Sequence, residues 1–250
     1  MKPAGTNLAR RRKPSVPRSS EKRGPSGGRR LRVLVTAGPT REYLDPVRFL
    51  SNPSTGRMGY AIAAALAAAG HEVTLVSGPV ALTPPEGARV VAVETTAEMA
   101  AAARRAFREC DAAVFAAAVC DYRPRRRASR KLPKAKGGML LELTPTTDIA
   151  AACGRIKGSR VTMGFALEDH DGRGHAERKL REKRFDAIVL NGPRTIGSPD
   201  AAVEFLRLGG RWESWPASAK KDVAVRLVAE LERLAAGRGS ARRQVVKRRP

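Results

Sequence analysis

The chain has 250 residues, of which 42% are hydrophobic and only 4% aromatic, and its net charge is +24. This length allows one sizeable domain whose core is built mostly from Ala, Val and Leu. No apolar run approaches the ~20 residues that span a bilayer, and no apolar stretch follows the basic N-terminus as it does in a secretory signal. We therefore expect a cytoplasmic protein that is neither membrane-spanning nor secreted.

More than half of the positive charge lies at the two ends of the chain. Residues 1–30 carry a net charge of +9 and residues 237–250 a net charge of +6. Both segments are too poor in apolar residues to form a core. The sequence thus predicts a disordered basic tail at 1–30, a folded domain at 31–236 and a second disordered basic tail at 237–250. The tails can touch polyanions nonspecifically, but they lack aromatic residues for stacking, and a general bias toward arginine is the simpler explanation.

The three cysteines and three histidines are scattered through the sequence. Neither a C-x-x-C spacing nor a pair of neighbouring histidines is present, so the sequence indicates no disulfide framework and no protein-bound metal site. These residues are Cys110, Cys120, Cys153, His71, His170 and His175.

Short apolar runs alternate with helical patterns along the chain. The expected strands cover residues 31–37, 72–76, 89–94, 111–119, 139–143, 160–166 and 186–191. The expected helices cover residues 54–69, 96–108, 148–156, 175–183 and 218–235. This alternation predicts an α/β fold with a Rossmann-like, doubly wound, mostly parallel sheet and helices on both of its faces. Alternating apolar residues around Gly209 and Gly210 predict a C-terminal β-hairpin.

The stretch RFLSNPSTGRMGY at residues 48–60 lies between the first strand and its alanine-rich helix. The N-terminus of a helix presents free N–H groups and a partial positive charge, so anions bind there readily. Gly56 and Gly59 would allow a phosphate to approach the backbone closely, and Arg48 and Arg57 would add charge. The spacing is neither G-x-G-x-x-G nor G-x-x-x-x-G-K-[ST], so it does not by itself decide for a phosphate site.

An ordinary helix start with Ser51 or Asn52 as its N-cap explains the same residues. The place of the stretch in the fold favours ligand binding, because ligands of doubly wound sheets bind outside the carboxyl ends of the strands. Asn52 falls at this edge, as do Gly38 after the first strand and Ala117 and Asp121 at the end of the fourth. We therefore expect a nucleotide site there.

Residues 122–138, with the sequence YRPRRRASRKLPKAKGG, are strongly cationic and too polar for a core. A solvated surface loop is the plain interpretation. Because the segment follows directly on the expected ligand edge, a mobile basic flap over a polyphosphate is the more attractive one.

At this point the chain resembles a known family, the phosphopantothenate–cysteine ligases, which form the C-terminal domain of the DNA/pantothenate metabolism flavoproteins. The motifs occur in family order across about residues 31–236. They are VLVTAGPTRE at 33–42, DPVRFLSNPSTGRMGYAIA at 45–63, VTLVSGP at 73–79, AAAVCDYRP at 116–124, TTDIAA at 146–151, GFALE at 164–168 and KLREKRFDAIVLN at 179–191. We expect a freestanding ligase domain, with a separate flavin-dependent decarboxylase as a candidate partner.

The resemblance implies a two-step ligation in coenzyme A biosynthesis. The carboxylate of 4′-phosphopantothenate attacks the α-phosphate of CTP, releases pyrophosphate and forms an acyl-cytidylate. The amine of cysteine then displaces CMP and gives phosphopantothenoylcysteine. The resemblance also implies Mg²⁺ on the triphosphate and a homodimer. CTP is the expected nucleotide because the motifs resemble bacterial members, while ATP remains an alternative.

The resemblance also implies roles for particular residues. Asn52 is expected to hold the acyl-nucleotide intermediate, since its amide can donate to a carboxylate that an aspartate would repel. Arg48 is expected to serve this site and the dimer contact. Lys131, in the flap, is expected to neutralise charge that develops on the leaving phosphate.

The remaining expected site residues contact the nucleotide or the other substrate. Lys179 and Lys183 are expected to hold the triphosphate, Phe165 to lie against the nucleotide, and Asp121 to contact it. The pocket is expected to be completed by Gly38, Ser54, Gly56, Arg57, Met58, Gly59, Ala117, Thr147, Asp148, Ile149 and Ala150.

Several residues depart from the family pattern. Cys120 stands where the family usually has alanine, and Arg57 stands where it has lysine. The segment 146–148 reads Thr-Thr-Asp in place of Asn-Pro-Asp, and Pro133 interrupts a run of basic residues in the flap. Because these positions border the expected base pocket and flap, the choice of nucleotide and the catalytic efficiency depend on them.

Two other functions remain open from the sequence. A nicotinamide-dependent reductase would also begin with a strand followed by glycine, but G-x-G-x-x-G is missing and no tyrosine is followed four residues later by lysine. The second alternative is a non-catalytic relative whose basic tails bind polyanions, although a run of charge is usually just a solvated segment.

Overall fold

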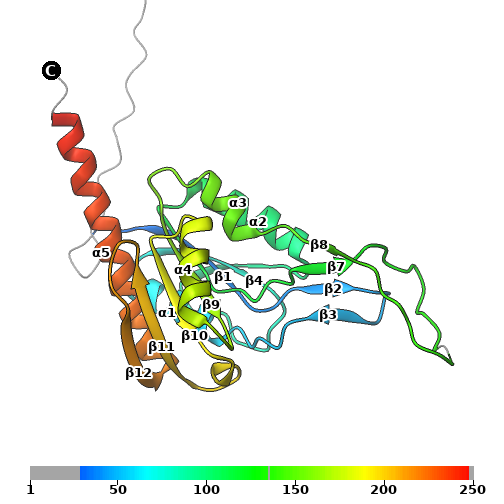
Figure 1. Ribbon diagram of the computed structural model, residues 1–250. Coiled ribbons are helices and arrows are strands. Elements are labelled where there is room, and N and C mark those ends of the chain that lie inside the picture. The colour runs from blue at the N-terminus through cyan, green and yellow to red at the C-terminus, as the bar shows by residue number, and fades with distance from the viewer. Residues whose placement is uncertain (1–28, 135, 248–250) are drawn as a thin grey trace, which may run out of the picture.

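The computed structural model describes residues 29–134 and 136–247. Figure 1 shows a central sheet flanked by helices, with an arm that extends to one side. The sheet has eight strands in the order β12-β11-β10-β9-β6-β1-β4-β5. Six of them are parallel: β5 (Ala88–Ala92), β4 (Glu72–Ser77), β1 (Arg32–Ala37), β6 (Ala112–Phe115), β9 (Val161–Leu167) and β10 (Ala187–Asn191).

The edge of the sheet beyond β10 is antiparallel. There β11 (Asp200–Arg207) and β12 (Glu213–Ala219) form the β-hairpin expected from the alternation around Gly209 and Gly210. The mostly parallel sheet and the C-terminal hairpin confirm the fold class predicted from the sequence.

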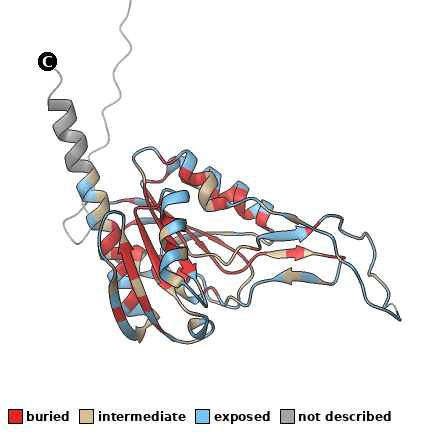
Figure 2. Ribbon diagram, in the orientation of Figure 1, coloured by how far each residue is buried: buried red, intermediate tan, exposed pale blue. Residues whose placement is uncertain are grey.

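Helices cover both faces of the sheet, and each face has its own apolar core (Figure 2). On one face α1 (Arg57–Ala68) and α5 (Lys220–Lys247) pack side by side against β1, β4, β9 and β11. On the other face lie α2 (Thr96–Glu109), α3 (Ile149–Arg155) and α4 (Gly172–Glu182), and a short 3-10 helix, η1 (Pro193–Thr195), follows β10. Because both faces are covered, the central strands are buried on both sides, which explains their unbroken apolar runs. Among the described helices, none is long and apolar enough to cross a membrane.

The arm consists of two short antiparallel ribbons. One pairs β2 (Arg41–Tyr43) with β3 (Phe49–Ser51), and the other pairs β7 (Tyr122–Pro124) with β8 (Leu143–Pro145). Figure 1 shows both ribbons extending from the sheet, with the basic segment between β7 and β8 at their far end. The strand expected at 139–143 is therefore wrong, since β8 begins only at Leu143.

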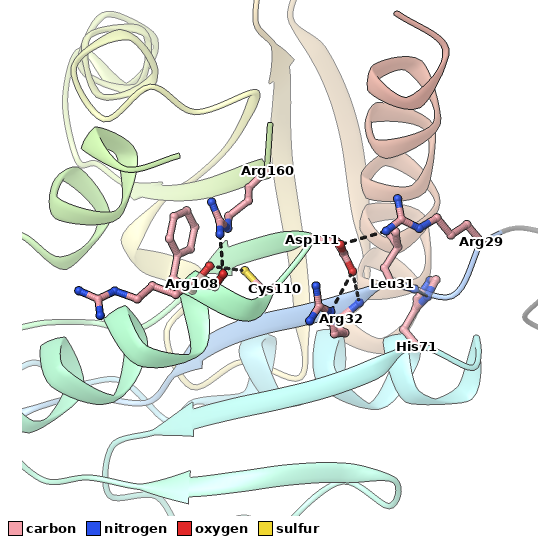
Figure 3. A network of polar contacts seen from close by, with 9 residues as sticks. Arg29, Leu31, Arg32, His71, Arg108, Cys110, Asp111 and Arg160 are labelled. Atoms are coloured by element: carbon pink, nitrogen blue, oxygen red, sulfur yellow. Dashed lines mark hydrogen bonds and ion pairs between the residues drawn. The ribbon is translucent and has the colours of Figure 1, made fainter. Parts of the chain in front are cut away.

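A band of polar contacts closes the amino ends of the strands, opposite the carboxyl-end edge (Figure 3). Asp111, just before β6, accepts hydrogen bonds from the backbone N–H of Arg32 at 2.9 Å and from the guanidinium of Arg29 at 3.2 Å. His71 accepts from the backbone N–H of Leu31 at 3.2 Å. These side chains satisfy backbone groups that the sheet leaves unpaired at its lower edge.

Several helix boundaries differ from the prediction because caps decide them. The helix expected from residue 96 is capped by Thr95, which forms a capping box with Glu98, and Thr96 is already inside the helix. The helix expected at 175–183 begins at Gly172, and the last helix begins at Lys220.

The C-terminal boundary also needs correction. We expected residues 237–250 to be a disordered tail, but α5 continues to Lys247, and Arg238 donates to the Arg160 carbonyl at 2.9 Å and to the Asp186 carboxylate. The basic tail expected at 1–30 lies outside the described residues except for Arg29 and Arg30, as do residues 248–250.

Candidate active site

A cavity of about 450 Å³ opens at the carboxyl ends of the parallel strands. Thr36, near the end of β1, and Phe115, at the end of β6, line its floor. The order of the strands reverses between β1 and β6, because β4 and β5 extend the sheet on one side and β9 and β10 on the other. Ligands of doubly wound sheets bind at this reversal, so the cavity has the position of a ligand site.

Most of the site residues predicted from the sequence line this cavity. They come from the loop before α1, the segment after β6, the start of α3, strand β9 and helix α4. These residues are Asn52, Ser54, Gly56, Arg57, Met58, Gly59, Ala117, Asp121, Thr147, Asp148, Ile149, Ala150, Phe165, Lys179 and Lys183. Segments more than 130 positions apart in the sequence therefore meet around one space.

The side chain of Asn52 ties the loop before α1 to the segment after β6. Its Nδ2 donates to the carbonyls of Ala118 at 3.2 Å and Val119 at 3.0 Å. Because both neighbours are acceptors, only the amide nitrogen can face them, which fixes the orientation of the amide. Its oxygen is thereby directed away from these two carbonyls, at the rim of the cavity.

Helix α1 begins at Arg57, three residues later than predicted, and neither Ser51 nor Asn52 is its N-cap. The N-cap is Gly56, whose φ of 74° lies in the left-handed region that glycine adopts readily. No side chain caps the first N–H groups, and the first turn contains no acidic residue. A Cβ at Gly59 would lie 2.5 Å from the Cβ of Ala37, so this glycine allows the helix to start close against the end of β1.

The two lysines of α4 reach the cavity paired with carboxylates. Lys179 contacts Glu168 at 2.5 Å, and Lys183, at the C-cap, contacts Asp148 at 3.1 Å. Burial alone would raise the pKa of Glu168, but the hydrogen bonds from Lys179 and His175 lower it. An incoming anion therefore meets two lysines whose charge is already balanced within the protein.

Cys120, a departure from the family pattern, lies behind the cavity wall. Its backbone N–H donates to Thr40 Oγ1 at 2.9 Å, and its thiol contacts the carbonyls of Thr40 and Leu50. Burial raises the pKa of this thiol, so it is neutral at physiological pH. The next residue, Asp121, lines the cavity with an exposed side chain.

Three predicted residues do not line the cavity. Gly38 packs behind the loop, where an added Cβ would lie 3.0 Å from the carbonyl oxygen of Gly78. Arg48 and Lys131 belong to the arm, and the exposed side chain of Lys131 forms no hydrogen bond or ion pair with the part of the chain that the structure describes. The flap is thus displaced from the cavity of its own chain.

Asp45 anchors the base of the arm. Its carboxylate is fully buried and accepts hydrogen bonds from the backbone N–H groups of Val47, Arg48 and Leu132 and from the guanidinium of Arg48. Arg48 in turn donates to the carbonyl of Leu132 at 2.8 Å. This cluster joins the basic segment to the strand pair β2–β3, so it sets where the flap begins.

Replacing Asp45 by asparagine is expected to lower the melting temperature at neutral pH, with a smaller difference in acid. Burial would raise the pKa of Asp45, but its hydrogen bonds, above all those from Arg48, lower it well below the ordinary value. A group whose folded-state pKa is depressed stabilises the fold above its unfolded pKa of about 4, and this contribution is lost as the pH falls. Melting curves of both proteins from pH 7 to pH 3 measure the effect. A constant difference across this range would contradict it.

The sequence missed several residues of the cavity. Thr36, Phe115 and Asn191 lie at or near the carboxyl ends of strands, so the rule that placed Ala117 at this edge would have found them too. Thr195 and Lys220 carry no such signal. They reach the cavity because η1 and the start of α5 fold over it, which depends on tertiary packing.

The sequence model of the DNA/pantothenate metabolism flavoprotein C-terminal domain family matches residues 29–234. The chain belongs to this family. Membership agrees with the motifs found in the sequence and argues against the nicotinamide-dependent reductase.

Individual relatives agree with the family. The crystal structure of the C-terminal domain of the coenzyme A biosynthesis bifunctional protein CoaBC has a TM-score of 0.72 and 38% sequence identity, covering 82% of this chain and 96% of that domain. The CoaBC protein of Bacillus subtilis (strain 168) is 39% identical over 207 residues, or 81% of this chain and 51% of its own length. A cysteine/cysteine sulfinic acid decarboxylase from an unidentified prokaryote is 48% identical over 176 residues, or 70% of this chain and 48% of its own length. The chain thus spans about half the length of these curated relatives.

Proposed function

We propose that the protein is a phosphopantothenate–cysteine ligase of coenzyme A biosynthesis. One observation carries the proposal: a single cavity at the strand-order reversal collects the amide of Asn52, the carboxylate of Asp121 and the ammonium groups of Lys179 and Lys183. Its volume of about 450 Å³ lies within the range of small-molecule sites. Family membership and the similarity to a CoaBC C-terminal domain support the same activity.

The proposed reaction has two steps on one carboxyl group. The carboxylate of 4′-phosphopantothenate attacks the α-phosphate of CTP, with ATP as the alternative, and pyrophosphate leaves. The amine of cysteine then attacks the acyl carbon and displaces the nucleoside monophosphate. Both steps bring several negative charges together, and fixed cations that neutralise developing charge are the main way in which proteins accelerate such transfers.

The residues of the cavity have distinct proposed roles. Asn52 places a neutral amide beside the reacting carboxylate and, by holding the segment after β6, shapes the floor of the site. Lys179 and Lys183 receive the nucleotide phosphates in exchange for their contacts with Glu168 and Asp148. Phe165 provides an apolar surface for the nucleotide.

Mg²⁺ would reach this site on the triphosphate. The ion usually keeps several waters and binds through phosphates and one or two carboxylates. Asp121 and Asp148 supply carboxylates at the cavity, so the residues present fit such an ion, which would neutralise phosphate charge when bound.

We also propose that the enzyme is a cytoplasmic homodimer that uses the arm as its contact. Large apolar side chains are exposed there, among them Phe49, Tyr122 and Leu140. Arg48 and Lys131 lie outside the cavity of their own chain, and a second copy would offer a way to bring the arm to a site. A separate flavin-dependent decarboxylase remains the candidate partner. Light scattering of the purified protein measures the mass, and a monomer at micromolar concentration would contradict the dimer.

The deciding experiment is a ligation assay with purified protein, 4′-phosphopantothenate, cysteine, Mg²⁺ and either CTP or ATP. We expect pyrophosphate and phosphopantothenoylcysteine, with CTP as the better nucleotide. Without cysteine, labelled pyrophosphate should exchange into CTP, because the first step is reversible. No pyrophosphate release with either nucleotide would contradict the proposal and favour the non-catalytic, polyanion-binding alternative.

A further inference from the structure

The cavity contains four cationic side chains, and they fall into two pairs. Lys179 and Lys183 come from α4, which covers one face of the sheet. Arg57 begins α1 and Lys220 begins α5, and these two helices pack side by side on the opposite face. The cavity therefore has a cationic side chain pair on each side of the sheet edge.

The two pairs differ in how their charge is balanced. Each lysine of α4 has a carboxylate partner, Glu168 or Asp148, within 3.1 Å. Arg57 forms no hydrogen bond or ion pair with the residues that the structure describes. Lys220 donates to a neutral acceptor, the carbonyl of Thr195, at 2.8 Å.

The surroundings of Lys220 disfavour an isolated positive charge. Burial lowers the pKa of its ammonium group, the charge of Arg57 lowers it further, and only Asp200 acts in the opposite direction. Two like charges that face one partly buried space repel each other, and an anion bound between them removes the repulsion. The ammonium group has three donors and spends one on Thr195, so it has donors left for a ligand.

We propose that Lys220 is a phosphate-binding residue of the active site and that it binds, together with Arg57, a phosphate group of one of the two anionic substrates. This inference rests on the proposed ligase function. The phosphate comes either from the nucleotide or from the 4′-phosphate of phosphopantothenate. A phosphate fits because lysine binds it as a compact point charge and because the first turns of α1 and α5 both face this space.

The test compares Lys220→Met with Lys221→Met, whose exposed side chain is the next residue of α5 and does not line the cavity. Kinetics are measured with each substrate varied in turn. We expect Lys220→Met to raise the KM of one substrate about 10- to 100-fold, the usual effect of one charged hydrogen bond, and Lys221→Met to leave it unchanged. An effect on the nucleotide KM assigns the phosphate to the nucleotide. An effect on the phosphopantothenate KM, absent when dephosphorylated pantothenate is the acceptor, assigns it to phosphopantothenate.

A binding measurement separates this inference from the ligase proposal. Calorimetric titration with inorganic pyrophosphate needs no turnover, and we expect the unmodified protein to bind it more than tenfold more tightly than Lys220→Met does. Lys220→Gln keeps a donor for Thr195 without the charge and serves if Lys220→Met does not fold. Failed ligation together with charge-dependent pyrophosphate binding would refute the function and retain the phosphate site. KM values and pyrophosphate affinities within twofold of the unmodified protein in both Lys220 variants would overturn the assignment.

Discussion

Asn52→Asp is expected to lower kcat/KM for ligation by at least about a thousandfold, roughly 4 kcal/mol of transition-state stabilisation. Two effects combine in this variant. The carboxylate would face the carbonyls of Ala118 and Val119, which now accept hydrogen bonds from the amide of Asn52. It would also place a negative charge beside the carboxylate of the substrate, and like charges this close strongly oppose each other.

Asn52→Ala separates these two effects, because it removes the donor without adding a charge. We expect its activity to lie between those of the unmodified protein and Asn52→Asp. Single-turnover measurements with saturating nucleotide give the rate of acyl-nucleotide formation, and circular dichroism checks the fold. A folded Asn52→Asp protein with activity within tenfold of normal would show that the reacting carboxylate lies elsewhere.

Lys131→Gln is expected to lower kcat about 100- to 1000-fold, the usual loss when a single stabilising donor is removed from a transition state. The side chain is exposed on the arm and has no acidic partner among the described residues, so its full charge is available when the arm reaches a site. The glutamine keeps a hydrogen-bond donor and most of the length but loses the charge.

Lys134→Gln, three residues later in the same basic segment and equally exposed, is the matched control. It removes the same charge from the flap without touching the predicted catalytic position, so we expect less than a threefold effect. Rates of pyrophosphate release at saturating substrates distinguish the two variants. Equal losses in both would mean that the flap acts only through its total charge.

The arrangement of the sheet could be predicted because it depends on local patterns. Buried parallel strands are continuous apolar runs, and helices between them bury one stripe each, so both periods are visible in the sequence. Errors occurred where the same composition serves two structures. Residues 116–119 are as apolar as β6, yet the strand ends at Phe115, and the following alanines turn aside to line the cavity and pair with Pro39.

The arm could not be predicted as sheet because each of its strands has only three residues. Such strands show no measurable alternation, and their stability comes from pairing with residues distant in the sequence. The site was predicted more fully than its geometry. Motifs identified Lys131 and Asn52 together, whereas the displacement of Lys131 from the cavity depends on how Asp45 and Arg48 fix the base of the arm. The catalytic roles of these residues stay predictions.

The polar band at the amino ends of the strands has a consequence for how the domain can be joined to other proteins. Asp111 holds Arg29, close to the start of β1, and Asp186 holds Arg238, far along α5. Both ends of the described chain are therefore fastened at the pole of the molecule that faces away from the cavity. A tag, a surface tether or a second catalytic unit fused at either end would leave the entrance open to substrates. Constructs cut inside residues 29–238 would instead remove an arginine and leave its aspartate uncompensated.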